Sequence, residues 1–419
     1  MASEKRNFFA ITIYQVLLRV GWIFKTESVI IPAALDSIGG VGWVRGCLPM
    51  LNRIGQSLPT LLVWPLIKNA RQQKRWLWVT TSLMGLLFCT LACLWWWELD
   101  SLGQWTQSIF LVVYALFFVA VGINQLSLSS LIGKLIRADL RGRLMLAANL
   151  FGCVFSIAAA WWVLRGWLAK SDAHFGAIFA TSGLLFLLAA ASALLIDEPS
   201  AERARDNPYR FSRTIKDVCN TILVDRHFRT LLIISSLFGL SMTLMPHYQS
   251  LGRSRLQLGF SDLLPWLIIQ NLGVAVFSIP VGWLADRWGN RAALRCVLLF
   301  LMLAPILALF FSTSESWGRT GFMGVFFLLG LMPVTMRILA NYSLEFTSQL
   351  NQPRYLVTQS LAMGLPVIFT SALMGLLVDE LGYDLVFGGV AVCVISAWLL
   401  TFCLHEPRDS PSKDREDDS

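Results

Sequence analysis

Long apolar stretches separated by short charged loops make up most of this 419-residue chain. A helix that crosses a bilayer needs about 20 predominantly apolar residues, and about twelve stretches are that long. They lack the alternation of apolar and polar residues that the strands of a membrane β-barrel require. The pattern therefore predicts an all-α membrane protein with twelve transmembrane helices, at residues 8–34, 42–67, 76–97, 105–134, 143–169, 175–197, 229–251, 261–285, 291–312, 318–345, 355–378 and 384–405.

A long polar segment separates the first six stretches from the last six. Its second half carries apolar residues at helical spacing, which predicts a helix lying at the membrane interface. The sequence thus predicts four parts: an N-terminal six-helix bundle (1–197), a cytoplasmic linker (198–228), a C-terminal six-helix bundle (229–405) and a disordered cytoplasmic tail (406–419).

The two six-helix halves resemble each other weakly. Pro49 lies near the start of the second stretch as Pro265 does in the eighth, and Pro32 and Pro246 lie near the ends of the first and seventh. Both pairs are separated by nearly the same number of residues. Such a constant offset is expected if one six-helix unit was duplicated.

Composition and charge support a membrane location. Of all residues, 56% are hydrophobic and 14% are charged, whereas soluble domains carry about 25% charged residues. The net charge of +8 does not indicate nucleic-acid binding, because Lys and Arg gather in the loops on one side of the predicted membrane. By the positive-inside rule, both termini are predicted to be cytoplasmic. The protein is predicted to lie in a plasma (inner) membrane, where lipid surrounds it. The eight Cys and four His form no metal-binding pattern, so no metal or cofactor is expected.

A charged, glycine-containing loop follows the eighth stretch, with the sequence Gly-Trp-Leu-Ala-Asp-Arg-Trp-Gly-Asn-Arg at 282–291. It resembles the signature loop of the major facilitator superfamily, whose members move small solutes by alternating access. The resemblance implies a monomeric transporter with two six-helix bundles. It also implies gating roles: close helix packing at Gly282, an acceptor at Asp286, cationic partners at Arg287 and Arg291, and a turn at Gly289.

Few ionisable residues lie inside the predicted spans. Each costs at least about 2.5–3.5 kcal/mol at the bilayer centre, so these residues should face a cavity or a partner. Arg19 and Arg53 fall near the middle of their spans, the depth at which transporters bind substrate. The candidate solute-binding residues are Arg19, Asn52, Arg53, Gln56, Asn124, Gln125, Asn271 and Arg337.

The excess of cations over carboxylates in the spans predicts an organic anion as the solute, since arginine forms bidentate pairs with carboxylates. Glu27 is the predicted proton-coupling residue. Structural alternatives stay open: Arg19 or Lys25 pairs with Glu27, and Arg45 extends toward the nearby membrane surface. Helical spacing would place Lys25 and Glu27 on nearly opposite faces, so a direct pair between those two is not expected.

Other functions remain to be weighed against anion transport. The many Phe and Trp residues would also suit a proton-driven exporter of drugs or other amphipathic compounds. An enzyme is not expected, because no span carries paired carboxylates, a His cluster or a nucleophile motif. His247 follows Pro246; an exposed polar cap on a broken helix is favoured there over a proton relay.

Overall fold

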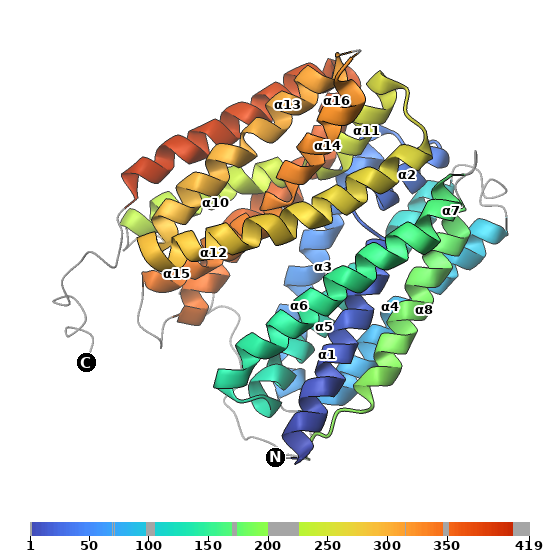
Figure 1. Ribbon diagram of the computed structural model, residues 1–419, viewed down its shortest axis with the longest axis vertical. Helices are drawn as coiled ribbons and strands as arrows, with labels where there is room; N and C mark the ends of the chain where they lie inside the picture. The colour runs from blue at the N-terminus through green and yellow to red at the C-terminus, as the bar shows by residue number, and fades with distance from the viewer. Residues whose placement is uncertain are drawn as a thin grey trace. The chain divides into compact units, whose positions relative to one another are not determined.

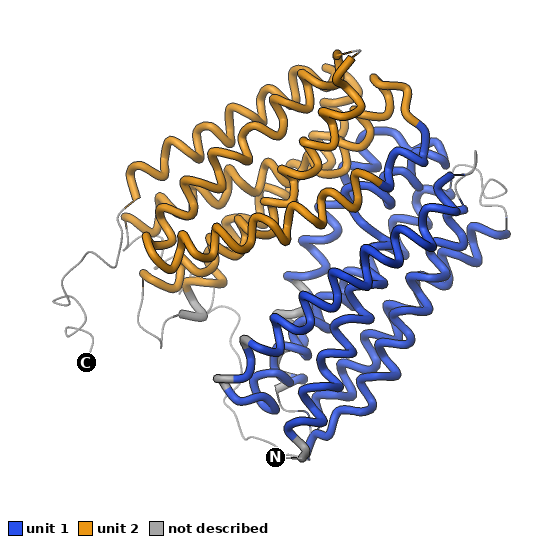
Figure 2. Tube along the Cα trace, in the orientation of Figure 1, with its two compact units in different colours: residues 1–208, 259–264 blue, residues 209–258, 265–419 orange. Residues whose placement is uncertain are grey.

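The computed structural model describes residues 2–68, 70, 72–97, 105–169, 174–199, 226–314, 316–346 and 352–404. These residues are helical almost throughout (Figure 1), and the described part of the chain contains no β-strand. The helices form two compact units (Figure 2). Unit 1 comprises Met1–Pro208 with Gly259–Leu264, and unit 2 comprises Tyr209–Leu258 with Pro265–Ser419.

In unit 1, long apolar helices pack around a core of interlocking aromatic rings. Phe88, Phe117 and Phe186 from three different helices contact one another, with ring centres 4.8–5.8 Å apart. Such offset and edge-on pairs stabilise a core beyond simple burial. The elements of this unit are α1 (Ala2–Ile23), α2 (Ile30–Ser37), α3 (Gly42–Lys68), α4 (Gln73–Trp96), α5 (Thr106–Leu135), α6 (Ala138–Ala159), the π-helical turn η2 (Ala160–Leu164), α7 (Arg165–Leu168), α8 (Phe175–Ala193) and the short η3 (Phe260–Asp262).

Unit 2 contains two very long helical stretches that each turn at a glycine. Gly289 has φ 88° and Gly382 has φ 81°, in the left-handed region that glycine adopts without steric cost. Each stretch is therefore two helices joined by a kink, as the two predicted spans on either side require. The elements are α10 (Arg226–Met242), α11 (Met245–Leu256), α12 (Leu263–Leu301), α13 (Leu303–Ser312), α14 (Gly318–Leu329), α15 (Leu331–Glu345), α16 (Gln352–Leu400) and η4 (Thr401–Cys403).

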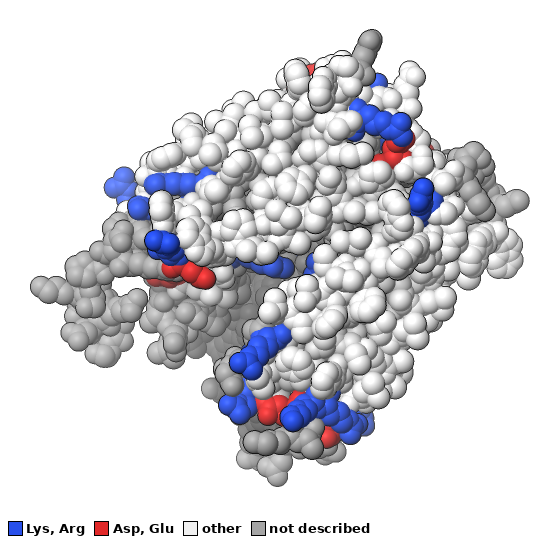
Figure 3. Space-filling view, in the orientation of Figure 1, with Lys and Arg blue, Asp and Glu red and all other residues white. Residues whose placement is uncertain are grey.

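Among the described residues, eight helical stretches are long and apolar enough to cross a membrane. Two of these stretches, Phe260–Ser312 and Tyr355–Cys403, each contain two predicted spans. The eight stretches therefore account for ten of the twelve predicted spans. The first predicted span corresponds to α1 with α2 and the second to α3. On the face drawn in Figure 3, charged side chains form a few separate groups and leave broad surfaces without Lys, Arg, Asp or Glu between them. The chain is a multi-pass, all-α membrane protein.

Several predicted spans are interrupted rather than continuous. The predicted span 8–34 was wrong in this respect, because α1 ends at Ile23 and α2 begins at Ile30. The seventh span breaks between α10 and α11, and the tenth breaks at Gly330 between α14 and α15. Most of the predicted interfacial helix and the predicted tail lie outside the described residues.

Polar contacts fasten the ends of each unit. In unit 1, the buried Glu198 accepts a hydrogen bond from the Lys74 backbone N–H and forms an ion pair with Lys134, both at 2.8 Å. Asn7 and Asp197 exchange two hydrogen bonds through the Asn7 amide and the Asp197 backbone. These contacts join the segment after α8 to α1, α4 and α5.

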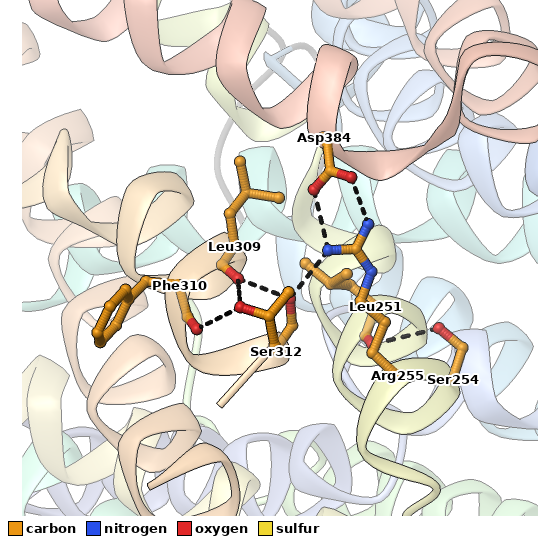
Figure 4. A network of polar contacts seen from close by, with 8 residues as sticks. Leu251, Ser254, Arg255, Leu309, Phe310, Ser312 and Asp384 are labelled. Atoms are coloured by element: carbon orange, nitrogen blue, oxygen red, sulfur yellow. Dashed lines mark hydrogen bonds and ion pairs between the residues drawn. The ribbon is translucent and has the colours of Figure 1, made fainter. Parts of the chain in front are cut away.

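In unit 2, a cluster of polar contacts joins α11, α13 and α16 (Figure 4). The Arg255 guanidinium donates to both carboxylate oxygens of Asp384, at 2.9 and 2.7 Å, and to Ser312 Oγ at 3.3 Å. The hydroxyl groups of Ser250 and Tyr383 lie 2.7 Å apart. Asp384 directly follows the kink in α16, so the cluster fixes the start of the last helix.

Candidate functional site

The break between α1 and α2 has a local cause in the sequence. Pro32 lies in the first turn of α2, where proline is tolerated, but its ring would clash with the carbonyl of Ser28 in a continuous helix. The backbone instead turns at Thr26, whose carbonyl accepts the N–H groups of both Ile30 and Ile31, at 2.9 and 3.1 Å, while the Lys25 N–H donates to a carbonyl only three residues back at 3.2 Å. The residues between the two helices are thereby freed from helical geometry.

This break brings together Lys25 and Glu27. Lys25 Nζ donates to Glu27 Oε1 at 2.8 Å; the Lys25 side chain is 0% exposed and the Glu27 side chain 22% exposed. The sequence-based expectation that these two residues would not pair was wrong. It assumed a continuous helix, whereas both residues lie in the non-helical segment.

Aromatic rings surround the Lys25 ammonium group. Its nitrogen lies 3.6 Å from the centre of the Trp22 ring and 4.8 Å from the centres of both Phe117 and Phe118. The Tyr114 ring follows at 5.8 Å. A cation is attracted to the negative face of an aromatic ring within about 6 Å. We call these four residues the aromatic cage; α1 supplies one ring and α5 the other three.

Helix α3 brings a row of amides to the carboxylate. Asn52 Nδ2 donates to Glu27 Oε2, and Gln56 Nε2 donates to Asn52 Oδ1. Asn52 and Gln56 are four residues apart on one face of α3. Arg53, the neighbour of Asn52, is 9% exposed and interacts electrostatically with Glu27. Among the described residues that these contacts join, Lys25 and Arg53 are cations and Glu27 is a carboxylate.

Two glycines allow α3 to approach α5 closely enough for this arrangement. A Cβ added at Gly55 would lie 2.5 Å from Phe118 Cβ, and one at Gly122 would lie 2.6 Å from the Gly55 carbonyl oxygen. Contacts this short do not occur between real side chains, so both positions require glycine. The close approach places the amide row of α3 next to the aromatic cage of α5.

Other predicted residues of unit 1 have separate partners. Arg19 Nη1 donates to Asn149 Oδ1 at 2.7 Å, which joins α1 to α6. Arg45 is buried and paired with Asp36. Gln125 is exposed on α5.

Asn124 is 1% exposed and lies in a buried polar network between helices. Its amide group donates to Thr81 Oγ1 at 2.7 Å and accepts from the Tyr14 hydroxyl at 3.0 Å. Tyr14 and Thr81 are themselves 2.9 Å apart. These contacts account for a polar residue at this position without a bound solute.

The predicted binding residues of unit 2 lie on two helices. Asn271 Nδ2 donates to the Leu267 carbonyl of its own helix, α12, at 2.9 Å. Arg337 is exposed on α15, as is Asn341 one turn further along. His247 is 0% exposed, so the expectation of an exposed polar cap was wrong, although α11 does begin beside it, at Met245.

The loop around Gly289 shows a mixed outcome. Asp286 and Arg287 are exposed, with the Arg287 guanidinium 5.4 Å from the Trp283 ring centre. Arg291 donates to the Leu404 carbonyl at 3.3 Å. Within the described part of the chain, a Cβ added at Gly282 meets no atom within 4 Å. The close packing implied for Gly282 is therefore not observed.

Sequence reasoning missed the aromatic cage. The available signal was the spacing of the rings: Tyr114, Phe117 and Phe118 share one face of α5, and Trp22 precedes Lys25 by three residues. Aromatic residues at helical spacing usually indicate a packed core. The identity of the group they surround could not be read from the pattern.

Comparison with known proteins agrees with this architecture. Residues 230–419 match the model of the Major Facilitator Superfamily, and no curated protein matches the chain. Among solved structures, a variant of the nucleoside transporter NupG is 12% identical with a TM-score of 0.75, and the match covers 94% of this chain and 99% of that one.

Two further structures share the fold. The D-xylose-proton symporter is 14% identical with a TM-score of 0.71, and the match covers 96% of this chain and 99% of that one. A bacterial homologue of the human lysosomal transporter Spinster is 10% identical with a TM-score of 0.62, covering 96% and 95%. The family model thus matches the C-terminal part of this chain, and the chain as a whole shares its fold with these transporters.

Proposed function

We propose that this transporter moves a small organic anion together with protons, through a site in unit 1 built from Glu27, Asn52, Arg53 and Gln56. The observation that carries this proposal is the ion pair of the buried Lys25 with Glu27 at 2.8 Å, with Arg53 beside it. Two cations lie beside one carboxylate among these described residues. Such a site would attract a solute with a negative charge.

Glu27 is suited to couple protons to the anion. Its carboxylate accepts hydrogen bonds from both Lys25 and Asn52, and it is partly exposed. Protonation would neutralise Glu27 and release both donors. The positive charge of the site would then increase by one, so proton binding and anion binding would strengthen each other reciprocally.

The remaining residues receive roles by their chemistry. Arg53 would grip a carboxylate through two parallel hydrogen bonds, while Asn52 and Gln56 would orient the solute. Asn124 is left out because its amide is committed to Tyr14 and Thr81. The same proposal includes solute contacts from Arg19, Gln125, Asn271 and Arg337. It also includes gating by Asp286, Arg287, Gly289 and Arg291. It further includes a monomeric state, a plasma-membrane location and cytoplasmic termini.

A second candidate is the export of amphipathic compounds. It is favoured by an open groove of about 660 Å³ in unit 1, lined by mostly apolar residues of α1, α6 and η2 that include Phe8, Phe151 and Trp162. A lipophilic cation bound near Glu27 would, however, meet a net positive charge. The charge balance therefore favours the anion.

A thermal-shift screen on the purified protein tests the choice. The panel contains small carboxylates, nucleosides, sugars and lipophilic cations, each measured at acidic and at neutral pH. A solute at about 100 times its dissociation constant stabilises the folded state by about 2.7 kcal/mol. We expect carboxylates to raise the melting temperature, and to do so more strongly at acidic pH.

The variant Arg53→Gln should lose this stabilisation. Arg45→Gln is the matched control, because it removes the same charge from the same helix but from a pair with Asp36. Stabilisation only by lipophilic cations would support the exporter. Stabilisation only by nucleosides or sugars, the solutes named for two of the similar structures, would contradict the anion assignment.

A further inference from the structure

The Lys25 ammonium group has an unusual set of neighbours. Its side chain is 0% exposed, and among the described residues Glu27 is its ion-pair partner. An ammonium group has three N–H donors. One of them reaches Glu27, and the aromatic cage lies around the nitrogen, with the nearest ring centre at 3.6 Å in Trp22.

Proton coupling at Glu27 creates a problem for this lysine. A protonated Glu27 is neutral, and it would leave the buried ammonium without a counter-charge. A buried charge without a partner is costly, and such a group tends to lose its proton. If Lys25 gave up a proton whenever Glu27 gained one, the site would take up no net proton.

We propose that the aromatic cage of Trp22, Tyr114, Phe117 and Phe118 keeps Lys25 charged while Glu27 carries the proton, a role that rests on the coupling function proposed above. Lys25 is thereby a positioning residue for proton coupling. The ring faces attract the cation whatever the state of Glu27. When Glu27 is neutral, the ammonium is free to move fully onto the rings, which then stabilise it most.

The groups that face Glu27 determine the direction of each effect. They are Lys25 in the same break, Asn52 and Arg53 on α3, and Tyr114 on α5. Removing the Lys25 ammonium makes protonation of Glu27 easier, because an adjacent cation favours the carboxylate. Removing a ring makes protonation of Glu27 harder, because the cage supports the protonated state. The two changes therefore act in opposite directions.

The experiment is an infrared titration of the purified protein without any solute. The absorption of protonated carboxyl groups is followed against pH, and the contribution of Glu27 is assigned as the part lost in Glu27→Gln. In Lys25→Met, we expect its midpoint to move to higher pH by about 1–3 units. In Trp22→Leu, we expect it to move to lower pH by about half a unit.

Three further variants serve as controls and alternatives. Trp22→Phe keeps a ring and should titrate close to the unmodified protein, and Lys25→Arg keeps the charge and should do the same. Phe117→Leu removes a second ring and should shift the midpoint in the same direction as Trp22→Leu, which provides the test if Trp22→Leu does not fold.

The outcomes separate this role from the proposed function. If the titration midpoint of Glu27 stays unchanged or rises when a ring is removed, the proposed role of the aromatic cage is wrong. Anion binding through Arg53 is tested separately, by the thermal-shift screen. Absence of any titrating component assigned to Glu27 overturns the cage and the coupling role together. Opposite shifts in the lysine and ring variants support the cage, since a merely structural role would not reverse their sign.

Discussion

Each unit contains an interrupted helix near its start, between α1 and α2 in unit 1 and between α10 and α11 in unit 2. The backbone contacts at the two breaks are alike, but the side chains there differ. In unit 1, the Thr26 hydroxyl donates to the carbonyl three residues earlier at 2.9 Å, and the Thr243 hydroxyl does the same in unit 2 at 2.6 Å. Proline follows in the first turn of the next helix in both, at Pro32 and Pro246. The local backbone device is thus repeated.

The side chains at the two breaks differ in charge. The break in unit 1 holds the ion pair Lys25–Glu27, whereas the start of α11 in unit 2 carries the buried His247 and Gln249. Both units thus contain an interrupted helix with the same local backbone contacts, and the break in unit 1 holds an ion pair. This difference is the reason why we propose proton coupling in unit 1.

The largest expected effect comes from neutralising the ionic break. In Glu27→Gln, transport driven by a pH gradient should be lost, because the only proposed proton carrier is gone. Exchange of solute for solute should persist, since Arg53 and the amides remain. Uptake into proteoliposomes with and without an imposed gradient measures both activities. Gradient-driven accumulation in this variant would contradict the coupling role.

The close approach of α3 to α5 gives the next effect. Gly55→Val places a Cβ 2.5 Å from Phe118 Cβ, and overpacking of this kind costs about 1–3 kcal/mol. We expect a lower melting temperature and loss of carboxylate binding. Gly282→Ala is the matched control, because its Cβ meets no atom within 4 Å among the described residues. Equal destabilisation by both variants would refute the structural distinction.

The exposed ion pair of unit 2 should matter much less. Asp384 is 72% exposed, and exposed salt bridges contribute about 0–1 kcal/mol. In Asp384→Asn, we expect a small fall in melting temperature that shrinks at high salt, with transport preserved. Differential scanning fluorimetry at two salt concentrations checks this, and loss of transport would show that the cluster in Figure 4 has a functional role.

The smallest effect is expected at the break in unit 2, beside His247. His247→Gln keeps a polar side chain of similar reach in unit 2, and it should leave the pH dependence of uptake unchanged. The pH profile of the variant, compared with that of Glu27→Gln, measures this directly. A profile that flattens in His247→Gln would move proton coupling to unit 2 and remove the contrast between the breaks.

The sequence predicted most of the spans, because the need for about 20 apolar residues acts locally on each helix. The kinks at Gly289 and Gly382 also fall between predicted spans. The Lys25–Glu27 pair was missed because spacing along an ideal helix does not apply where the helix breaks. The hydrogen bonds of Asn124 could not be predicted either, because its partners, Tyr14 and Thr81, come from other helices.

Proton uptake on solute binding tests the central claim most directly. The carboxylate that stabilises the purified protein is added in weakly buffered solution near the midpoint for Glu27, and the pH change is recorded. We predict uptake of up to about one proton per bound anion, and none in Glu27→Gln. Equal proton uptake in both proteins, or none in either, would contradict coupling at the ionic break of unit 1.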